Sequence, residues 1–233
     1  FKINCITERS YENGIKEKLI CEFNIINIGV NLFVDEAQKL SRINAFVYQN
    51  YKLFNYDFIK VKQLCYTHPL AGELFSCFMM RKEILNNCVN KIDKIIELLN
   101  KEIFTKCIIY TEYIDFANVI YNQLKALKQN VCIYHSEIKD RKALLQDFKD
   151  NKYNIIISVK CLDEGLNIPD VDLIIISAAS SQERQTIQRI GRSLRYKENK
   201  IALIYNLYVR DSKEEEWLRK RLVNFDRNRV FWK

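Results

Sequence analysis

Residues 154–195 read NIIISVKCLDEGLNIPDVDLIIISAASSQERQTIQRIGRSLR, and this stretch decides the fold. Two short runs in it, 154–158 (NIIIS) and 173–177 (LIIIS), are rich in β-branched isoleucine and are predicted to be strands. Their apolar residues are continuous rather than alternating with polar ones, which is typical of strands buried on both faces. The stretch therefore predicts a sheet that is covered on both sides.

The same pattern continues outward from this stretch. Further strands are predicted at 106–111, 131–134 and 201–208, and helices are predicted around 84–99, 117–127, 144–148 and 181–195. Strands that alternate with amphipathic helices indicate an α/β fold with a parallel sheet and helices on both faces. We expect this domain to span residues 81–233, with a charged helix at 214–233 docked by Trp217, Leu218 and Leu222.

Residues 1–80 are predicted to be a connecting or accessory segment, a small strand-helix extension that precedes the sheet domain. It would contain a short helix at 11–18, a strand within 19–34 and a helix at 35–51, for which Asp35 is the expected N-cap and Glu36 lies in the first turn. Residues 52–80 hold many aromatic residues without a clear period, and we expect a loop-rich connection there.

The predicted helix 181–195 has one face suited to phosphate. Its polar face carries Arg184, Gln188, Arg192 and Arg195, and its apolar face carries Ile187, Ile190 and Leu194. Each guanidinium can donate two parallel hydrogen bonds to phosphate oxygens. The alternative is an ordinary basic surface helix, in which these side chains are only solvated.

Composition limits the classes of partner. The chain has 37 Lys and Arg against 29 Asp and Glu, a net charge of +8, which favours a polyanionic partner. The eight cysteines show no C-x-x-C spacing and lie in apolar segments, so we expect reduced core residues in an intracellular protein, cytoplasmic or nuclear. No apolar run approaches the roughly 20 residues of a membrane span, so no membrane partner is expected. The sequence begins at Phe1, which predicts a piece of a longer protein.

Polar strings follow the predicted strands: Thr111-Glu112, His135-Ser136, Ser158 to Pro169, and Ser180-Ser181. In a doubly wound sheet, ligands bind beyond the carboxyl ends of the strands. These strings are therefore the candidate binding positions.

This order of motifs resembles the second, C-terminal RecA-like domain of superfamily 2 helicases and translocases. The matching strings are CIIYTEYIDFANVIYNQL, IYHSEIKDRKALLQDFK, the stretch 154–195 and IYNLYVRDSKEEEWLRKRL, and they run from about residue 81 to about residue 222. Within the superfamily the chain looks most like the branch of the xeroderma pigmentosum group B helicase and the restriction-enzyme motors. The resemblance implies a RecA-like fold and a nucleic-acid partner, with DNA favoured over RNA.

The resemblance also implies roles for single residues. Gln188 would contact the terminal phosphates of ATP, and Arg192 and Arg195 would be arginine fingers that stabilise charge on the transferred phosphoryl group. Gly165 and Asn167 would lie near the ribose. The residues that would contact the nucleic-acid backbone are Thr111, His135, Ser136, Ser158 and Lys160.

Two positions depart from the family pattern. The family commonly has Asp where this chain has Asn167, and Thr where it has Val159. The first departure removes charge assistance from hydroxyl recognition, and the second leaves that contact to Ser158 or Lys160. For several residues an ordinary role is also open: His135 can be a satisfied loop histidine, Thr111 can simply end a strand, and the charged residues at 213–221 can be a solvated helix face.

Asp35-Glu36-Ala37-Gln38 looks like the magnesium-binding acidic box of a helicase motor. Against that reading, no G-x-x-x-x-G-K-[ST] loop occurs in the chain and no Ser-Ala-Thr motif follows the acidic residues. We interpret the string as the start of a helix, with the acidic box as the alternative.

The predicted function is therefore the C-terminal motor domain of an ATP-dependent helicase or double-stranded DNA translocase. ATP with Mg²⁺ would be shared with an N-terminal RecA-like domain that holds the metal, so this chain alone should not hydrolyse ATP. One alternative is a non-catalytic helicase-like module for nucleic-acid binding or protein docking. Another is a phosphate-binding α/β domain of a different enzyme, which fits less well because the chain has only five glycines and no glycine-rich loop.

Overall fold

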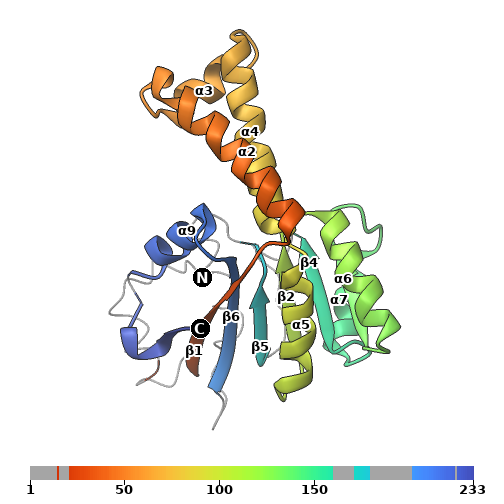
Figure 1. Cartoon of the computed structure of the whole chain (residues 1–233). Helices are drawn as coiled ribbons and strands as arrows, with labels where there is room; N and C mark the ends of the chain where they lie inside the picture. The colour runs from red at the N-terminus through yellow and green to blue at the C-terminus, as the bar shows by residue number, and fades with distance from the viewer. Residues whose placement is uncertain (1–14, 16–20, 160–170, 179–200, 224) are drawn as a thin grey trace. The chain divides into compact units, whose positions relative to one another are not determined.

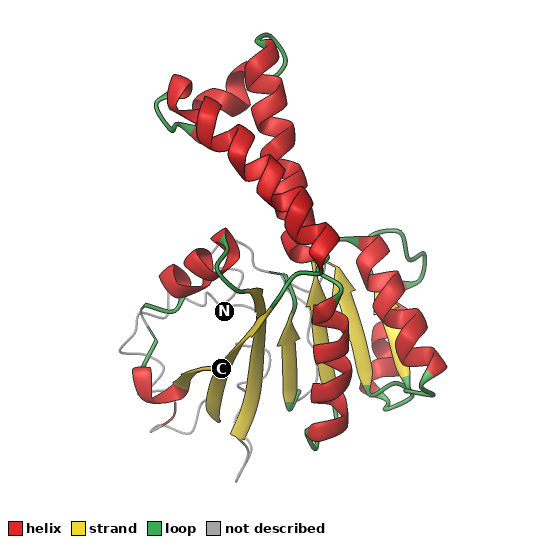
Figure 2. Ribbon diagram, viewed as in Figure 1, coloured by secondary structure: helices red, strands yellow, loops and turns green. Residues whose placement is uncertain are grey.

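The computed structural model describes residues 15, 21–159, 171–178, 201–223 and 225–233. The chain divides into two compact units, one formed by residues 1–30 and 91–233 and the other by residues 31–90. Figure 1 traces the chain by residue number, and Figure 2 shows the helices and strands of each unit.

The first unit, called the sheet unit here, contains a seven-stranded sheet in the described part of the chain. Its strands are β1 (Glu22–Val30), β2 (Cys107–Thr111), β3 (Val131–Tyr134), β4 (Ile155–Val159), β5 (Leu173–Ile176), β6 (Ile201–Val209) and β7 (Val230–Trp232). The spatial order is β3-β4-β2-β5-β6-β1-β7, and every neighbouring pair is parallel. The prediction of a parallel α/β sheet is confirmed.

Helices cover both faces of this sheet. They are α5 (Asn90–Lys101), α6 (Ile114–Ala126), α7 (Arg141–Lys149) and α9 (Lys213–Arg221), followed by the short 3-10 helix η2 (Arg227–Arg229). Buried residues of α5 and α6 share one hydrophobic cluster, and buried residues of α7 and α9 share the other. The two clusters lie on opposite faces because successive strand residues point to opposite sides.

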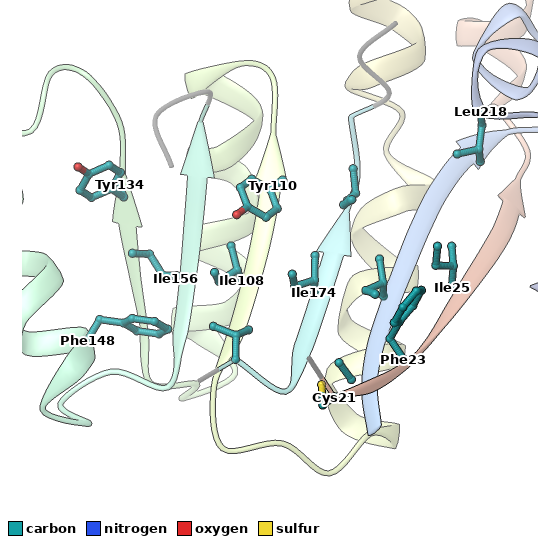
Figure 3. Close-up of a cluster of buried hydrophobic side chains, with 14 of the residues drawn as sticks. Cys21, Phe23, Ile25, Ile108, Tyr110, Tyr134, Phe148, Ile156, Ile174 and Leu218 are labelled. Atoms are coloured by element: carbon teal, nitrogen blue, oxygen red, sulfur yellow. The ribbon is translucent and has the colours of Figure 1, made fainter. Parts of the chain in front are cut away.

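Strand β2 shows how both faces are filled. Ile108 and Tyr110 belong to the cluster of α7 and α9, whereas Cys107 and Ile109 belong to the cluster of α5 and α6. Figure 3 shows the cluster of α7 and α9, in which Phe148 of α7 and Leu218 of α9 lie over the strands. Burial on both sides explains why the strands are continuously apolar in sequence.

The second unit, called the helical unit here, spans residues 31–90. It contains α2 (Val34–Asn50), the 3-10 helix η1 (Tyr51–Phe54), α3 (Phe58–Leu64) and α4 (Pro69–Asn86). Its buried core consists of Val47, Phe54, Val61, Ala71, Leu74 and Phe78. The prediction of a loop-rich connection at 52–80 is wrong, because three helical segments pack there around a core of their own.

The ends of the helical unit meet. The side-chain Nδ2 of Asn90 donates a hydrogen bond of 2.7 Å to the backbone carbonyl oxygen of Asn31, and the Cys88 thiol lies 3.6 Å from the same oxygen. The unit is therefore an insertion whose entry and exit points are adjacent.

The boundary between the units differs from the one expected at residue 80. Strand β1 lies inside the sheet, paired with β6 over its full length, because its apolar residues fill both clusters. It is therefore not part of an extension that precedes the sheet. The single helix expected across 84–99 is divided, since α4 ends at Asn86 and α5 begins at Asn90.

The carboxyl-terminal residues also differ from expectation. The charged helix predicted at 214–233 ends at Arg221, and residues 230–232 form β7 beside β1. Two backbone hydrogen bonds fix this strand: Lys233 N–H donates to Asn27 O (2.9 Å), and Gly29 N–H donates to Lys233 O (3.1 Å). The Asn27 side chain also donates to Phe231 O (3.1 Å) and accepts from the Asn206 side chain (2.8 Å).

Helix α2 is capped two residues earlier than expected, so the prediction of Asp35 as its N-cap is wrong. Phe33 is the N-cap, whereas Asp35 lies exposed in the first turn. One oxygen of Glu36 accepts from Phe33 N–H (2.9 Å) and the other from Val89 N–H (3.2 Å). The contacts of Glu36 fit the interpretation of this string as a helix start, in which Asp35 lies in the first turn.

The expectation of core cysteines holds for four of the six described ones. Cys21, Cys88, Cys107 and Cys132 are buried, and burial raises the pKa of Cys132 to about 12. Cys65 and Cys77 are partly exposed, so the expectation is wrong for them. None of the helices in the described ranges combines the length and apolar character needed to cross a bilayer.

Candidate nucleic-acid interface

Three neighbouring strands bring predicted contact residues to one edge of the sheet. In the order β3-β4-β2, Tyr134 pairs with Ser158, which pairs with Tyr110 on its other side. Thr111 is the last residue of β2, and His135 and Ser136 directly follow β3. Because the strands are parallel, all these residues lie at the carboxyl edge of the sheet.

Thr111 and Ser158 are fully buried at this edge. The Thr111 hydroxyl donates a long hydrogen bond of 3.5 Å to the backbone oxygen of Ser158, which links β2 to β4. The Ser158 hydroxyl has no hydrogen-bond partner among the residues that the structure describes. A buried hydroxyl without a partner is costly, so it is a position where another polar group would be favourable.

The loop after β3 presents one exposed candidate. His135 is 8% exposed, and its Nδ1 accepts from Glu137 N–H at 3.3 Å, so it has the local role that the sequence left open. Ser136 beside it is exposed. The loop ends where the Asp140 carboxylate caps α7 by accepting from Ala143 N–H (3.0 Å). Of the four described candidates, Ser136 is therefore the one whose side chain is open to solvent.

The remaining predicted site residues lie outside the described ranges: Lys160, Gly165, Asn167, Gln188, Arg192 and Arg195. They belong to residues 160–170 and 179–200, which follow β4 and β5 in the chain. Both strands end at the carboxyl edge, on either side of β2. The ATP assignments stay predictions, and no ATP contact is derived from the structure.

A buried ion pair at the same edge was missed in the sequence. Lys91 Nζ lies 2.7 Å and 2.9 Å from the two carboxylate oxygens of Glu214, and both side chains are 0% exposed. Lys91 Nζ also donates to the carbonyl oxygen of Ser177 (2.8 Å). Glu214 and Arg221 are buried, so interpreting the charged run of α9 as a wholly solvated face is wrong for these two residues.

The sequence held only a weak signal for this pair. Glu214 stands in the run Glu214-Glu215-Glu216, and nothing in its composition separates the buried carboxylate from the two beside it. At helical spacing Glu214 is four residues before Leu218, which docks the helix. That spacing could have marked Glu214 as inward-facing.

Comparison with known proteins supports the fold and shows a similarity to helicases over part of the chain. Residues 90–197 match the family model "Helicase conserved C-terminal domain". The chain is 27% identical over 220 residues to the DNA 3'-5' translocase XPB2 of Sulfurisphaera tokodaii. That alignment covers 91% of this chain and 49% of XPB2, so the chain spans about half the length of this relative.

Solved structures show the same architecture. The C-terminal domain of the DEAD-box protein Dbp5 matches with a TM-score of 0.56 at 22% identity, covering 63% of this chain and 84% of that domain. Dbp5 of S. cerevisiae bound to RNA and ADP BeF3 matches with a TM-score of 0.53 at 15% identity, covering 91% of this chain and 41% of that one.

The predicted RecA-like fold is confirmed by the sheet and by these structures. The family match begins at α5 and continues through the sheet unit to residue 197. Residues 90–197 match the helicase conserved C-terminal domain, so this part of the chain resembles the second, RecA-like domain of superfamily 2 helicases and translocases.

Proposed function

We propose that this chain is the C-terminal motor domain of an intracellular, ATP-dependent DNA helicase or double-stranded DNA translocase. The observation that carries the proposal is the meeting of β3, β4 and β2 at one carboxyl edge with Ser136, Ser158 and Thr111. The segments with Lys160 and with the arginines leave the sheet from β4 and β5 at that edge. One edge thus serves both nucleic acid and nucleotide in the proposal.

DNA is the proposed substrate. XPB2 is by name a DNA translocase, and it aligns over most of this chain, whereas the Dbp5 structure holds RNA but supports the fold alone at 15% identity. The chain's net charge of +8 suits a phosphate backbone. Ser136 would contact the backbone, which positions a strand without reading its sequence.

The nucleotide-facing role rests on Gln188, Arg192 and Arg195. In the proposal these side chains reach ATP that is held with Mg²⁺ by an N-terminal RecA-like domain of the same protein. ATP supplies the phosphoryl group whose developing charge the two guanidiniums stabilise. Because the phosphate- and metal-holding half lies in the other domain, this chain alone should not hydrolyse ATP.

The test replaces the proposed fingers in the full-length protein. Arg192→Ala or Arg195→Ala should lower DNA-stimulated ATP turnover by about 10³-fold, because charge on the transferred phosphoryl group would lose a guanidinium. DNA binding without nucleotide should stay near the wild-type value. Steady-state ATPase assays and fluorescence anisotropy with a labelled duplex measure the two quantities.

Arg184→Ala is the matched control, since Arg184 shares the predicted helical face but has no assigned nucleotide contact. It should retain wild-type turnover. Wild-type turnover in both finger variants would refute the finger assignment. DNA binding by a wild-type protein that hydrolyses no ATP would instead favour a non-catalytic nucleic-acid-binding module.

A further inference from the structure

Lys91 and Glu214 join the first turns of two helices on opposite faces of the sheet. Lys91 is the second residue of α5 and Glu214 the second residue of α9. The Lys91 ammonium has three donors, and three oxygens accept from it: both carboxylate oxygens of Glu214 and the carbonyl oxygen of Ser177. The pair therefore crosses the carboxyl edge of the sheet, where β5 ends.

A buried ion pair such as Lys91–Glu214 adds little to the net stability of a fold. Both side chains are 0% exposed, and moving two charges out of water carries a desolvation cost that their attraction only partly offsets. Apolar residues of similar volume are often as stabilising as a buried ion pair. What apolar residues cannot do is bind the Ser177 carbonyl, so the pair's distinctive effect is positional.

The hydrogen bonds extend from the pair to other strand ends. Glu214 Oε2 accepts from Val209 N–H at 2.8 Å, which fixes the end of β6. Ser177 donates twice to the carbonyl oxygen of Tyr110 in β2, from its backbone N–H (3.0 Å) and from its hydroxyl (3.1 Å). The pair thus holds the ends of β5, β6 and β2 in one buried network.

This network is bonded to one part of the proposed motor site, and it adjoins in sequence the segment that contains the other. Thr111, next to Tyr110, bonds to the backbone of Ser158 in β4, where the candidate nucleic-acid residues lie. In the other direction, Ser177 and Ala178 lead into residues 179–200, which contain Gln188, Arg192 and Arg195. The end of β5, which Lys91 holds, is therefore hydrogen-bonded to the β2 end on one side and precedes the arginine segment in the sequence.

We propose that Lys91 and Glu214 are a positioning pair, which fixes the carboxyl end of β5 so that DNA binding at the β2 and β4 ends is converted into ATP turnover. The pair touches neither DNA nor ATP in this proposal. The inference rests on the proposed motor function for its effect on turnover, and on the described contacts for its effect on the end of β5.

The principal variant is Lys91→Met with Glu214→Met in the full-length protein. It removes both charges and keeps apolar volume, so the unfolding midpoint should be unchanged or higher. DNA-stimulated kcat should fall about 10-fold, while KM for ATP and Kd for the duplex should stay within about 2-fold. A smaller fraction of active protein would also lower the apparent kcat at unchanged KM and Kd, so an unchanged unfolding midpoint is what separates a positioning effect from misfolding.

The matched control is Lys213→Met with Glu216→Met, an exposed ion pair of 2.8 Å on the same helix. Its kcat should equal that of the wild type. Lys91→Gln with Glu214→Gln, which keeps neutral hydrogen-bonding groups, replaces the principal variant if that one does not fold. It should also lower kcat, and wild-type kcat in a folded variant of the buried pair overturns the proposal.

Amide hydrogen exchange separates this proposal from the proposed function. In the buried-pair variant, exchange at residues 176–178 and at Val209 should become faster, while the control variant should match the wild type. If the wild-type protein hydrolyses no ATP, the motor function fails and exchange alone decides the positioning role. Unchanged exchange at these residues overturns it.

Discussion

Two buried serines at the carboxyl edge differ in how their hydroxyls are bonded. The Ser177 hydroxyl donates to the Tyr110 carbonyl at 3.1 Å, whereas that of Ser158 has no partner within the described residues. Both residues are 0% exposed. The cost of removing each hydroxyl should therefore differ, although the two substitutions are chemically identical.

Ser158→Ala should leave the free energy of unfolding unchanged or raise it, because no hydrogen bond is lost and a buried hydroxyl without a partner among the described residues is removed. Ser177→Ala is the comparison and should cost about 1 kcal/mol, since it leaves the Tyr110 carbonyl with one donor fewer. Urea unfolding monitored by circular dichroism measures both. A cost at Ser158 equal to that at Ser177 would mean that its hydroxyl is bonded in solution.

At this scale the sequence predicted where polar residues gather but not how they are bonded. The strand ends located Thr111 and Ser158 correctly at one edge, because parallel strands must end together. The complete burial of Thr111 and Ser158 depends on how the rest of the chain packs against this edge. The order of residues in the sequence does not reveal that packing. The Lys91–Glu214 pair joins residues 123 positions apart, a distance over which no local pattern connects them.

Among the elements, β7 protects one side of β1. It pairs with Ile25, Ile26 and Asn27, and its Trp232 ring lies 4.2 Å from the guanidinium carbon of Arg219 on α9. The same ring makes an edge contact with Tyr208 of β6 at a centroid distance of 5.7 Å. Through its contacts with Arg219 and Tyr208, Trp232 thus connects the edge strand β7 to α9 and to β6.

Removal of residues 230–233 should destabilise the sheet unit by about 2 kcal/mol, because the backbone groups of β1 and the Trp232 contacts are lost together. For a chain of this size that corresponds to a fall in Tm of about 6 °C. Differential scanning calorimetry gives the measurement. Lys233→Ala should leave Tm unchanged because only backbone atoms of Lys233 bond to β1, and an equal loss in both variants would contradict the role of the strand.

The elements predicted well are those whose pattern is strong. Strands β2 to β6 were located within a residue or two, since each is an uninterrupted apolar run. β7 was missed because three residues after a charged helix give too short a pattern to separate from a loop. In α4 the buried residues Ala71, Leu74 and Phe78 do recur at helical spacing, but exposed Met79 and Met80 beside them hid the period.

At the scale of the whole molecule, the helical unit is an insertion with its own core. Its buried cluster is made of residues between 47 and 78, and neither cluster of the sheet unit contains a residue from 31–90. The entry and exit points are joined by the Asn90–Asn31 hydrogen bond of 2.7 Å. Insertions with adjacent ends can often be removed without breaking the fold that carries them.

Excision of residues 32–89, with Asn31 and Asn90 joined by a short glycine-serine linker, should leave the sheet unit folded. Its far-ultraviolet circular dichroism should lose helix signal, while cooperative unfolding of the remaining unit persists. Excision of segment 114–149, which contains α6, β3 and α7, is the control. It should abolish cooperative unfolding because it removes a strand and one helix from each cluster. Loss of cooperative folding in both variants would show that the sheet unit depends on the insertion.

The position of β1 also bears on the order in which the chain can fold. Its partners, β6 and β7, begin 171 or more residues after Val30. During synthesis, β1 would leave the ribosome before its partner strands and stay unpaired until the last part of the described chain is made. The helical unit, whose contacts are local, could fold in that interval, so β1, which is made before the other strands of the described sheet, would be among the last of them to pair.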